Sequence, residues 1–102
     1  MDSNDLTVVI VTFKSEDKIH SCLNSIPKNI RTIIVENSSD ENFKKKVEDK
    51  YSNVKCILSG ANKGYAVANN IGLKQVQTRF ALVLNPDAIL GKDVVDSFFS
   101  IV

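Results

Sequence analysis

Short apolar runs recur along the chain, and each is followed by a segment with helical spacing of its apolar residues. The first run, Leu6 to Phe13, is a nearly continuous series of β-branched residues, which is typical of a strand covered on both faces. Further runs cover residues 32–35, 54–58 and 80–84. This alternation predicts an α/β fold: three α/β/α layers around a doubly wound, mostly parallel sheet of about four strands.

The segments between the runs carry signals for helix ends. Ser15 is placed to cap the first helix, and Pro27 ends it. Asp40 is placed to cap the second helix, and the third is expected from Gly64 to about Gln77. These connections have ordinary lengths for a compact α/β domain.

The last predicted helix carries an apolar stripe that includes Val95, Phe98 and Phe99 and reaches the final residue, Val102. A domain seldom ends on an unfinished apolar stripe, so we expect the chain to be part of a longer protein. An exposed stripe at Phe98 and Phe99 is also a candidate dimer contact.

Composition narrows the function. The 102 residues include 13 Lys and Arg against 12 Asp and Glu, which is one domain without the basic excess of a nucleic-acid binder. Two cysteines form neither a disulfide scaffold nor a zinc site. The polar start MDSND is unlike a signal peptide, and no apolar run approaches the roughly 18 residues of a membrane span. We expect a cytoplasmic domain that handles a small molecule and no nucleic acid.

The ends of the predicted strands are unusually polar. In open parallel sheets, ligands bind outside the carboxyl ends of the strands, so these positions are the candidates for chemistry. The sequence has neither a G-x-G-x-x-G nor a P-loop pattern. A receiver-like domain would carry paired acids after the first strand, where this chain has Lys14. The polar strand ends are Thr12-Phe13-Lys14, residues 36–40, residues 62–65 and Asn85-Pro86-Asp87.

Blocks of sequence at these strand ends resemble the motifs of family 2 glycosyltransferases with the GT-A fold, in particular rhamnosyltransferase-like members. The blocks are VIVTFK at 9–14, IVENSSD at 34–40 and NKGYAVANNIG at 62–72, followed by LVLNPD at 82–87. The family's counterparts are V-T-Y-N, V-D-N-x-S-x-D and, for the last block, D-x-D. The resemblance implies that residues 1–102 are the nucleotide-sugar-binding N-terminal part of such a domain, ending before the acceptor-binding half.

The resemblance also implies roles for the nucleoside end of the site. Thr12 and Phe13 would line the base pocket. Glu36, which stands where the family has aspartate, would accept a hydrogen bond from the imide N–H of a pyrimidine, because an ionised carboxylate only accepts. Asn37 lies at the same strand end and is a further candidate for nucleotide binding.

The third block would shape the loop and the helix start beside the nucleoside. Asn62, Gly64 and Asn70 are its candidate residues, and glycine at position 64 permits a positive φ or a close backbone approach. Asparagines 69 and 70 both fall inside the predicted helix, where asparagine is unfavourable, so one of them is expected to be buried, and the family pattern favours Asn70.

The last block would hold the phosphate end. Asn85 would lie near the ribose, and Asp87 would bind Mg²⁺ or Mn²⁺. A single carboxylate suffices for Mg²⁺ when substrate phosphates supply further ligands. The general base of the family lies well downstream of D-x-D, so we expect it beyond residue 102 and expect no catalytic residue within this chain.

The function implied for the full-length enzyme is transfer of a sugar, with inversion, from a dTDP- or UDP-sugar to a saccharide or lipid-linked acceptor in cell-envelope polysaccharide synthesis. Whether the full protein associates with a membrane stays open. The alternatives are a non-catalytic flavodoxin-like or receiver-like nucleotide-binding or signalling domain, and a degenerate homologue that serves as a scaffold.

Plainer interpretations exist for individual residues. Asp87 belongs to Asn-Pro-Asp, a good turn opener, and Glu36 would be a solvated acid at a strand end. Asn37 would only satisfy donors in a turn, and Tyr65 is expected to pack rather than stack on a ligand. Cysteines 22 and 56 fall on apolar positions and are expected to be buried, reduced thiols.

Overall fold

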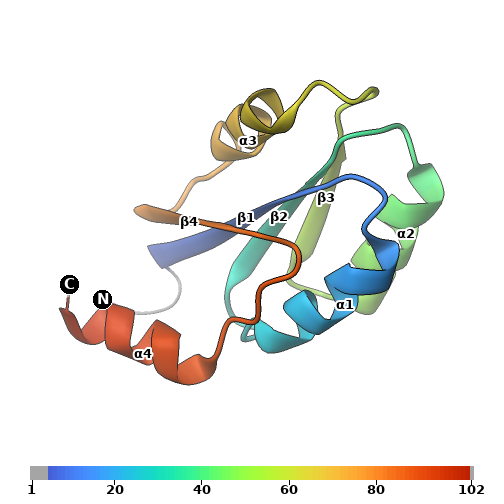
Figure 1. Ribbon diagram of the computed structural model, residues 1–102. Helices are drawn as coiled ribbons and strands as arrows, with labels where there is room; N and C mark the ends of the chain where they lie inside the picture. Colours follow the sequence, from blue (N-terminus) through green and yellow to red (C-terminus); the bar gives the residue numbers. More distant parts are fainter. Residues whose placement is uncertain (1–4, 102) are drawn as a thin grey trace.

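A computed structural model describes residues 5–101, and the side chains of residues 92 and 98–101 lie outside that description. Strands and helices alternate along the described chain (Figure 1). The strands are β1 (Leu6–Thr12), β2 (Arg31–Glu36), β3 (Val54–Leu58) and β4 (Phe80–Leu84). The helices are α1 (Glu16–Ser25), α2 (Glu41–Lys50), α3 (Tyr65–Leu73) and α4 (Lys92–Ile101).

The described strands form one parallel sheet in the order β3-β2-β1-β4. Thr12 is opposite Glu36, and Glu36 is opposite Leu58, so the carboxyl ends of β1, β2 and β3 are level. The chain order reverses at β1, which lies between β2 and β4, and such a switch point opens a crevice at the carboxyl edge. The α/β prediction is confirmed. The flavodoxin-like alternative is wrong, because that architecture has the order 2-1-3-4.

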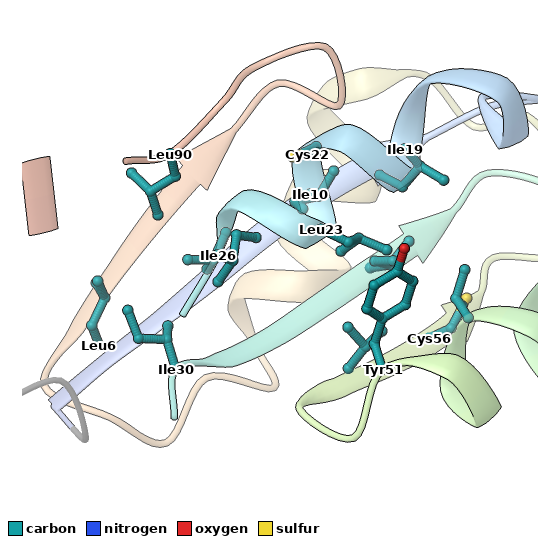
Figure 2. Packing of buried hydrophobic residues seen from close by; sticks show 14 of the residues in the cluster. Leu6, Ile10, Ile19, Cys22, Leu23, Ile26, Ile30, Tyr51, Cys56 and Leu90 are labelled. Atoms are coloured by element: carbon teal, nitrogen blue, oxygen red, sulfur yellow. The ribbon is translucent and has the colours of Figure 1, made fainter. Parts of the chain in front are cut away.

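Alternate residues of β1 face opposite sides of the sheet. Val8 and Ile10 join the larger core with residues of α1, α2 and α4, whereas Val11 faces α3. Figure 2 shows the larger core, where Ile19 and Cys22 of α1 pack over the sheet. The layers are therefore α1, α2 and α4 on one face and α3 on the other (Figure 1).

Glycine sets how close α3 lies to the sheet. A Cβ atom at Gly72 would be 2.7 Å from Val9 Cγ1 and 3.0 Å from Val35 Cγ2. Both distances are shorter than carbon atoms tolerate in a packed core, so only glycine permits this approach. The close packing fixes α3 over β1 and β2 and holds its first turn at the carboxyl edge of the sheet.

The predicted helix starts had mixed outcomes. Asp40 caps α2, because its Oδ1 accepts a hydrogen bond of 3.0 Å from the Phe43 backbone N–H. Ser15 occupies the N-cap position of α1 but makes no side-chain cap, so that prediction is wrong. Its hydroxyl instead lies 3.3 Å from the carbonyl oxygen of Phe13, which keeps it on the preceding turn.

The third helix is shorter than predicted. It ends at Leu73 rather than near Gln77, since the Gln75 and Val76 N–H groups bond to the carbonyls of Gly72 and Leu73 in tight turns. Val76 still packs against the α3 side of the core, so the apolar spacing continues past the end of the helix. Periodicity alone therefore overestimated its length.

Two further findings concern the C-terminal region and membranes. The predicted apolar contact at Phe98 and Phe99 falls on side chains outside the described part of the structure. Across residues 5–101, none of the helices combines the length and the apolar character that crossing a bilayer requires.

Candidate functional site

An open cleft of about 400 Å³ lies at the carboxyl ends of β1 and β4, at the switch point of the sheet. Predicted site residues from three strand ends and one loop line it. They are Thr12, Phe13, Asn37, Asn62, Asn85 and Asp87, together with Val11, Ser15, Tyr65 and Pro86. Another cleft, of about 270 Å³, borders residues at the amino ends of the strands, such as Thr7 and Arg31, and none of the predicted residues lines it.

We distinguish two walls of the cleft at the switch point. The β2–α3 wall consists of residues 36–38, at the end of β2, and residues 59–64, between β3 and α3. The β4 wall consists of residues 85–88, which follow β4. Side-chain hydrogen bonds hold the β2–α3 wall together, whereas a single turn forms the β4 wall.

Glu36 is part of the β2–α3 wall but is only 2% exposed. Its Oε1 accepts a hydrogen bond of 2.9 Å from the Thr12 hydroxyl, and its Oε2 accepts a short one from the Ser38 hydroxyl. The interpretation of Glu36 as a solvated acid is therefore wrong. A buried charge needs such partners, because an unpaired one would be costly. The carboxylate does not itself line the cleft.

Asn37 organises the β2–α3 wall. It is 3% exposed, and its Nδ2 donates to Asn62 Oδ1 and to the Gly64 carbonyl, both at 3.2 Å. Its Oδ1 accepts from the Ser59 hydroxyl at 2.8 Å and from the Lys63 backbone N–H at 3.1 Å. The side-chain amide is thus fully engaged, which supports the plainer view that Asn37 satisfies turn donors and acceptors.

Gly64 shapes the same wall from behind, outside the lining of the cleft. Its φ of 86° and ψ of 162° lie in a region that is essentially restricted to glycine. A Cβ atom there would meet nothing within 4 Å, so the backbone conformation and not space requires glycine. The prediction of a positive φ at this position is confirmed.

The β4 wall is built on an Asn-Pro-Asp turn. Asn85 Oδ1 accepts from the Asp87 backbone N–H at 2.9 Å, and the Asn85 carbonyl accepts from Ala88 N–H at 2.9 Å. The Cys22 thiol lies under this turn, 3.8 Å from the Asn85 carbonyl oxygen. The turn-forming side chain is therefore Asn85, and the exposed carboxylate of Asp87 takes no part in these hydrogen bonds.

Burial and charge both act on the thiol beneath this wall. Burial raises the pKa of Cys22 to about 11, and the negative charge of Asp87 adds to the increase. Burial likewise raises the pKa of Cys56 to about 12. Both cysteines are free and buried, so the prediction of buried thiols outside any disulfide is confirmed.

Two aromatic side chains flank the cleft. Phe13 is 44% exposed and Tyr65 is 58% exposed. The packing role predicted for Tyr65 is wrong, because the residue begins α3 at the edge of the sheet and projects beside the cleft. Its position directly after Gly64, at a helix start, was the signal that sequence reasoning missed.

Asn70 does not reach the cleft, and its side chain is exposed. Asn69 is the more buried of the pair, with an Oδ1 that is buried and lacks a hydrogen-bond partner in the described structure. The preference for Asn70 as the buried residue is therefore wrong. Ala68 and Gly72 turn one side of α3 to the sheet, and a shift of one residue rotates a helical side chain by about 100°.

The donor groups of the cleft suit a cation that shares its ligands with a substrate. Among the described residues, no three His, Cys, Asp or Glu side chains gather as a metal centre. Asp87 offers one exposed carboxylate, and Asn85 is committed to its turn. A hard cation such as Mg²⁺ takes oxygen ligands and commonly completes its shell with substrate phosphates and water.

Comparison with known families decides what such a cleft belongs to. The family described as Glycosyl transferase family 2 matches residues 7–99, nearly the whole chain. The chain belongs to this family. The resemblance found in its strand-end motifs is confirmed, and the receiver-like alternative is set aside.

Relatives of this glycosyltransferase chain come from archaea and bacteria. It is 29% identical over 102 residues to the low-salt glycan biosynthesis hexosyltransferase Agl10 of Haloferax volcanii. The matched region covers 96% of the chain and 33% of Agl10. It is 32% identical over 92 residues to the teichoic acid poly(glycerol phosphate) polymerase of Staphylococcus epidermidis, which covers 82% of the chain and 13% of the polymerase. The chain thus spans a third or less of these relatives.

Solved structures agree on the fold. The crystal structure of S. aureus TarS 1–349 superimposes with a TM-score of 0.80 at 24% identity, covering 94% of this chain and 31% of TarS 1–349. The same TarS fragment in complex with UDP gives a TM-score of 0.78. At this identity the likeness establishes the fold alone, an α/β arrangement that matches part of a GT-A domain.

Proposed function

We propose that this family 2 glycosyltransferase chain binds a UDP- or dTDP-sugar in the cleft at the carboxyl ends of β1 and β4. The observation that carries the proposal is the convergence of Thr12, Asn62 and Asp87 on one cleft, from distant parts of the sequence. The UDP complex of TarS, which has the same fold, supports a nucleoside diphosphate as the ligand.

The chemistry of the residues that line the cleft suggests how the donor lies. The aromatic rings of Phe13 and Tyr65 and the amide of Asn62 suit a nucleoside, because rings stack on bases and amides complement their polar edges. The exposed carboxylate of Asp87 suits the diphosphate with its cation. We therefore orient the base toward the β2–α3 wall and the diphosphate toward the β4 wall.

Recognition of the pyrimidine imide by Glu36 requires the buried carboxylate to become accessible from the cleft. Ser38 is only half-buried, unlike Thr12, so its hydroxyl is the one that can leave the carboxylate. An imide N–H would then replace the Ser38 hydroxyl as the donor to Oε2. The carboxylate would remain held by Thr12, which keeps it in place for the base.

We propose that Asp87 holds Mg²⁺ or Mn²⁺ together with the donor diphosphate. When bound, such a cation stabilises the negative charge that develops on the leaving nucleoside diphosphate. Asn85 positions Asp87 through the turn, and the aromatic rings orient the nucleoside. Each of these residues acts by binding and positioning the donor, and none takes a proton from the acceptor.

We assign sugar transfer to a longer protein of which this chain is the donor-binding part. An inverting reaction needs a general base for the acceptor hydroxyl. Glu36 is buried outside the lining of the cleft, and Asp87, which lines it, is assigned to the cation, so we place the base beyond residue 102. We expect residues 1–102 alone to bind nucleotide weakly without turnover.

The relatives suggest where that reaction belongs. Their names refer to low-salt glycan biosynthesis and to teichoic acid polymerisation. We accordingly propose a saccharide or lipid-linked acceptor, cell-envelope synthesis and a cytoplasmic site of action.

The test is a titration of the ¹⁵N-labelled chain with UDP and dTDP, each with and without Mg²⁺, followed by amide chemical shifts. We expect shifts at Thr12, Phe13 and Asn62 with either nucleotide, and an additional Mg²⁺-dependent shift at Asp87. ADP, a purine diphosphate, is the control and should cause smaller shifts near the base. Absence of shifts around the cleft at millimolar UDP and dTDP with Mg²⁺ would overturn the proposal.

A further inference from the structure

A lysine stands beside the one exposed carboxylate that lines the cleft. The Nζ atom of Lys18 lies 3.9 Å from Asp87 Oδ1, and the two side chains are 70% and 60% exposed. Lys18 comes from the first turns of α1, after β1, whereas Asp87 follows β4. The pair therefore bridges the two strands on either side of the switch point.

This ion pair contributes little to folding, because both partners are exposed and their separation is at the outer limit for such a contact. Its consequence is electrostatic. A magnesium ion on the Oδ1 atom of Asp87, at about 2.1 Å, would lie no more than about 6 Å from the Lys18 ammonium. Like charges so close repel each other, so Lys18 disfavours a divalent cation at Asp87 when no anion is present.

A diphosphate removes that conflict, because its negative oxygens attract both the cation and the ammonium group. Lysine suits this exchange, since its long flexible stem and its three donors allow it to change partners. Lys14 is less suited, because its Nζ lies 5.2 Å from the centroid of the Phe13 ring. Among the described residues, Lys18 is the one that forms an ion pair with Asp87.

We propose that Lys18 is a positioning residue for the donor diphosphate: it pairs with Asp87 in the free protein and binds a diphosphate oxygen once a divalent cation occupies Asp87. This inference rests on the proposed function. It predicts that cation and nucleotide bind with positive coupling, each strengthening the other. Exchange of partners by one lysine supplies that coupling.

The test compares the wild type with Lys18→Met and Lys18→Arg, and uses Lys45→Met as the matched control. Lys45 is an exposed lysine of α2, and neither it nor Lys18 is among the residues that line the cleft, but Lys18 pairs with Asp87. The probes are Mn²⁺ alone, inorganic pyrophosphate, UDP and uridine, with affinities measured from amide shifts and from Mn²⁺ broadening. All of these are binding measurements, so none depends on transferase activity.

For Lys18→Met we expect a loss of roughly three- to tenfold in affinity for pyrophosphate and for UDP in the presence of Mn²⁺, because one charge-assisted hydrogen bond is removed. Affinity for Mn²⁺ alone should rise and that for uridine should stay the same. Lys18→Arg should retain most of the diphosphate affinity, and Lys45→Met should match the wild type.

Two results separate the proposals. If the wild type binds UDP in the cleft and Lys18→Met binds UDP and Mn²⁺ with unchanged affinity, the role of Lys18 is wrong and the donor site stands. If the wild type binds neither nucleotide in the cleft, the proposed function is wrong and the role of Lys18 falls with it. An equal loss for uridine and UDP would also contradict the diphosphate contact.

Discussion

The two walls of the cleft are built in opposite ways. In the β2–α3 wall, the polar groups of Glu36 and Asn37 are buried and bound to neighbouring residues before any ligand arrives. In the β4 wall, Asp87 is exposed, and its described ion-pair partner is the exposed side chain of Lys18 at 3.9 Å. A preorganised wall loses little entropy on binding and selects by shape, whereas an exposed charge stays free to respond to a cation or a phosphate.

The largest expected effect comes from the centre of the β2–α3 wall. Asn37→Ala removes the amide that joins Ser59, Asn62, Lys63 and Gly64, and with it four part-buried hydrogen bonds. We expect a loss of about 2–3 kcal/mol in the free energy of unfolding, measured by urea denaturation. The counterpart on the β4 wall, Asn85→Ala, should cost only about 1 kcal/mol. Equal losses would contradict the difference between the walls.

Glu36→Gln tests whether the buried carboxylate serves the fold. In the wild type, the hydroxyls of Thr12 and Ser38 donate to the two carboxylate oxygens. The variant keeps the shape of the side chain but presents an amide nitrogen, itself a donor, to one of these hydroxyls. We expect a loss of about 1–2 kcal/mol in the free energy of unfolding. If the variant is as stable as the wild type but binds UDP more weakly, the carboxylate serves ligand binding and not the fold.

Alkaline pH tests the thiol under the β4 wall. The pKa of Cys22 is raised to about 11 in the folded chain from an ordinary value of 9.0, so the unfolded chain loses the thiol proton first. The contribution of this thiol to the free energy of unfolding is fully present below pH 9 and is lost as the pH rises through 11. We expect a decrease of about 1 kcal/mol between pH 9 and 10 from this group.

Denaturation midpoints at these pH values check this prediction, with Cys22→Ala as the reference. The variant is expected to be less stable at pH 7, because it loses a buried side chain, but to show a shallower decline above pH 9. An identical decline in both proteins would contradict a buried, neutral thiol at this position.

The smallest effect on stability is expected at Asp87. Asp87→Asn keeps the side-chain size at an exposed position, so the free energy of unfolding should change by less than about 0.5 kcal/mol. The gain in UDP affinity on adding Mg²⁺ should disappear, because the amide is a poor ligand for a hard cation. A variant that retains the full Mg²⁺ effect would remove Asp87 from the proposed cation site.

Much of the fold followed from local sequence. The short apolar runs predicted the strands of the described sheet, and the cap at Asp40 and the positive φ at Gly64 were predicted correctly, because these features depend on neighbouring residues. The strand-end motifs identified the family and placed six of the nine candidate nucleotide-binding residues around one cleft, because parallel strands bring their carboxyl ends to the same edge.

What the tertiary structure decided was the surroundings of individual side chains. The depth of Glu36, the exposure of Tyr65, the inward turn of Asn69 instead of Asn70 and the approach of Lys18 to Asp87 depend on partners far away in the sequence. Periodicity locates a helix but does not fix its rotation about its own axis. A shift of one residue rotates the side chain that faces the sheet by about 100°. Packing of α1 and α3 against the sheet settles that rotation, and with it the residues that face the ligand.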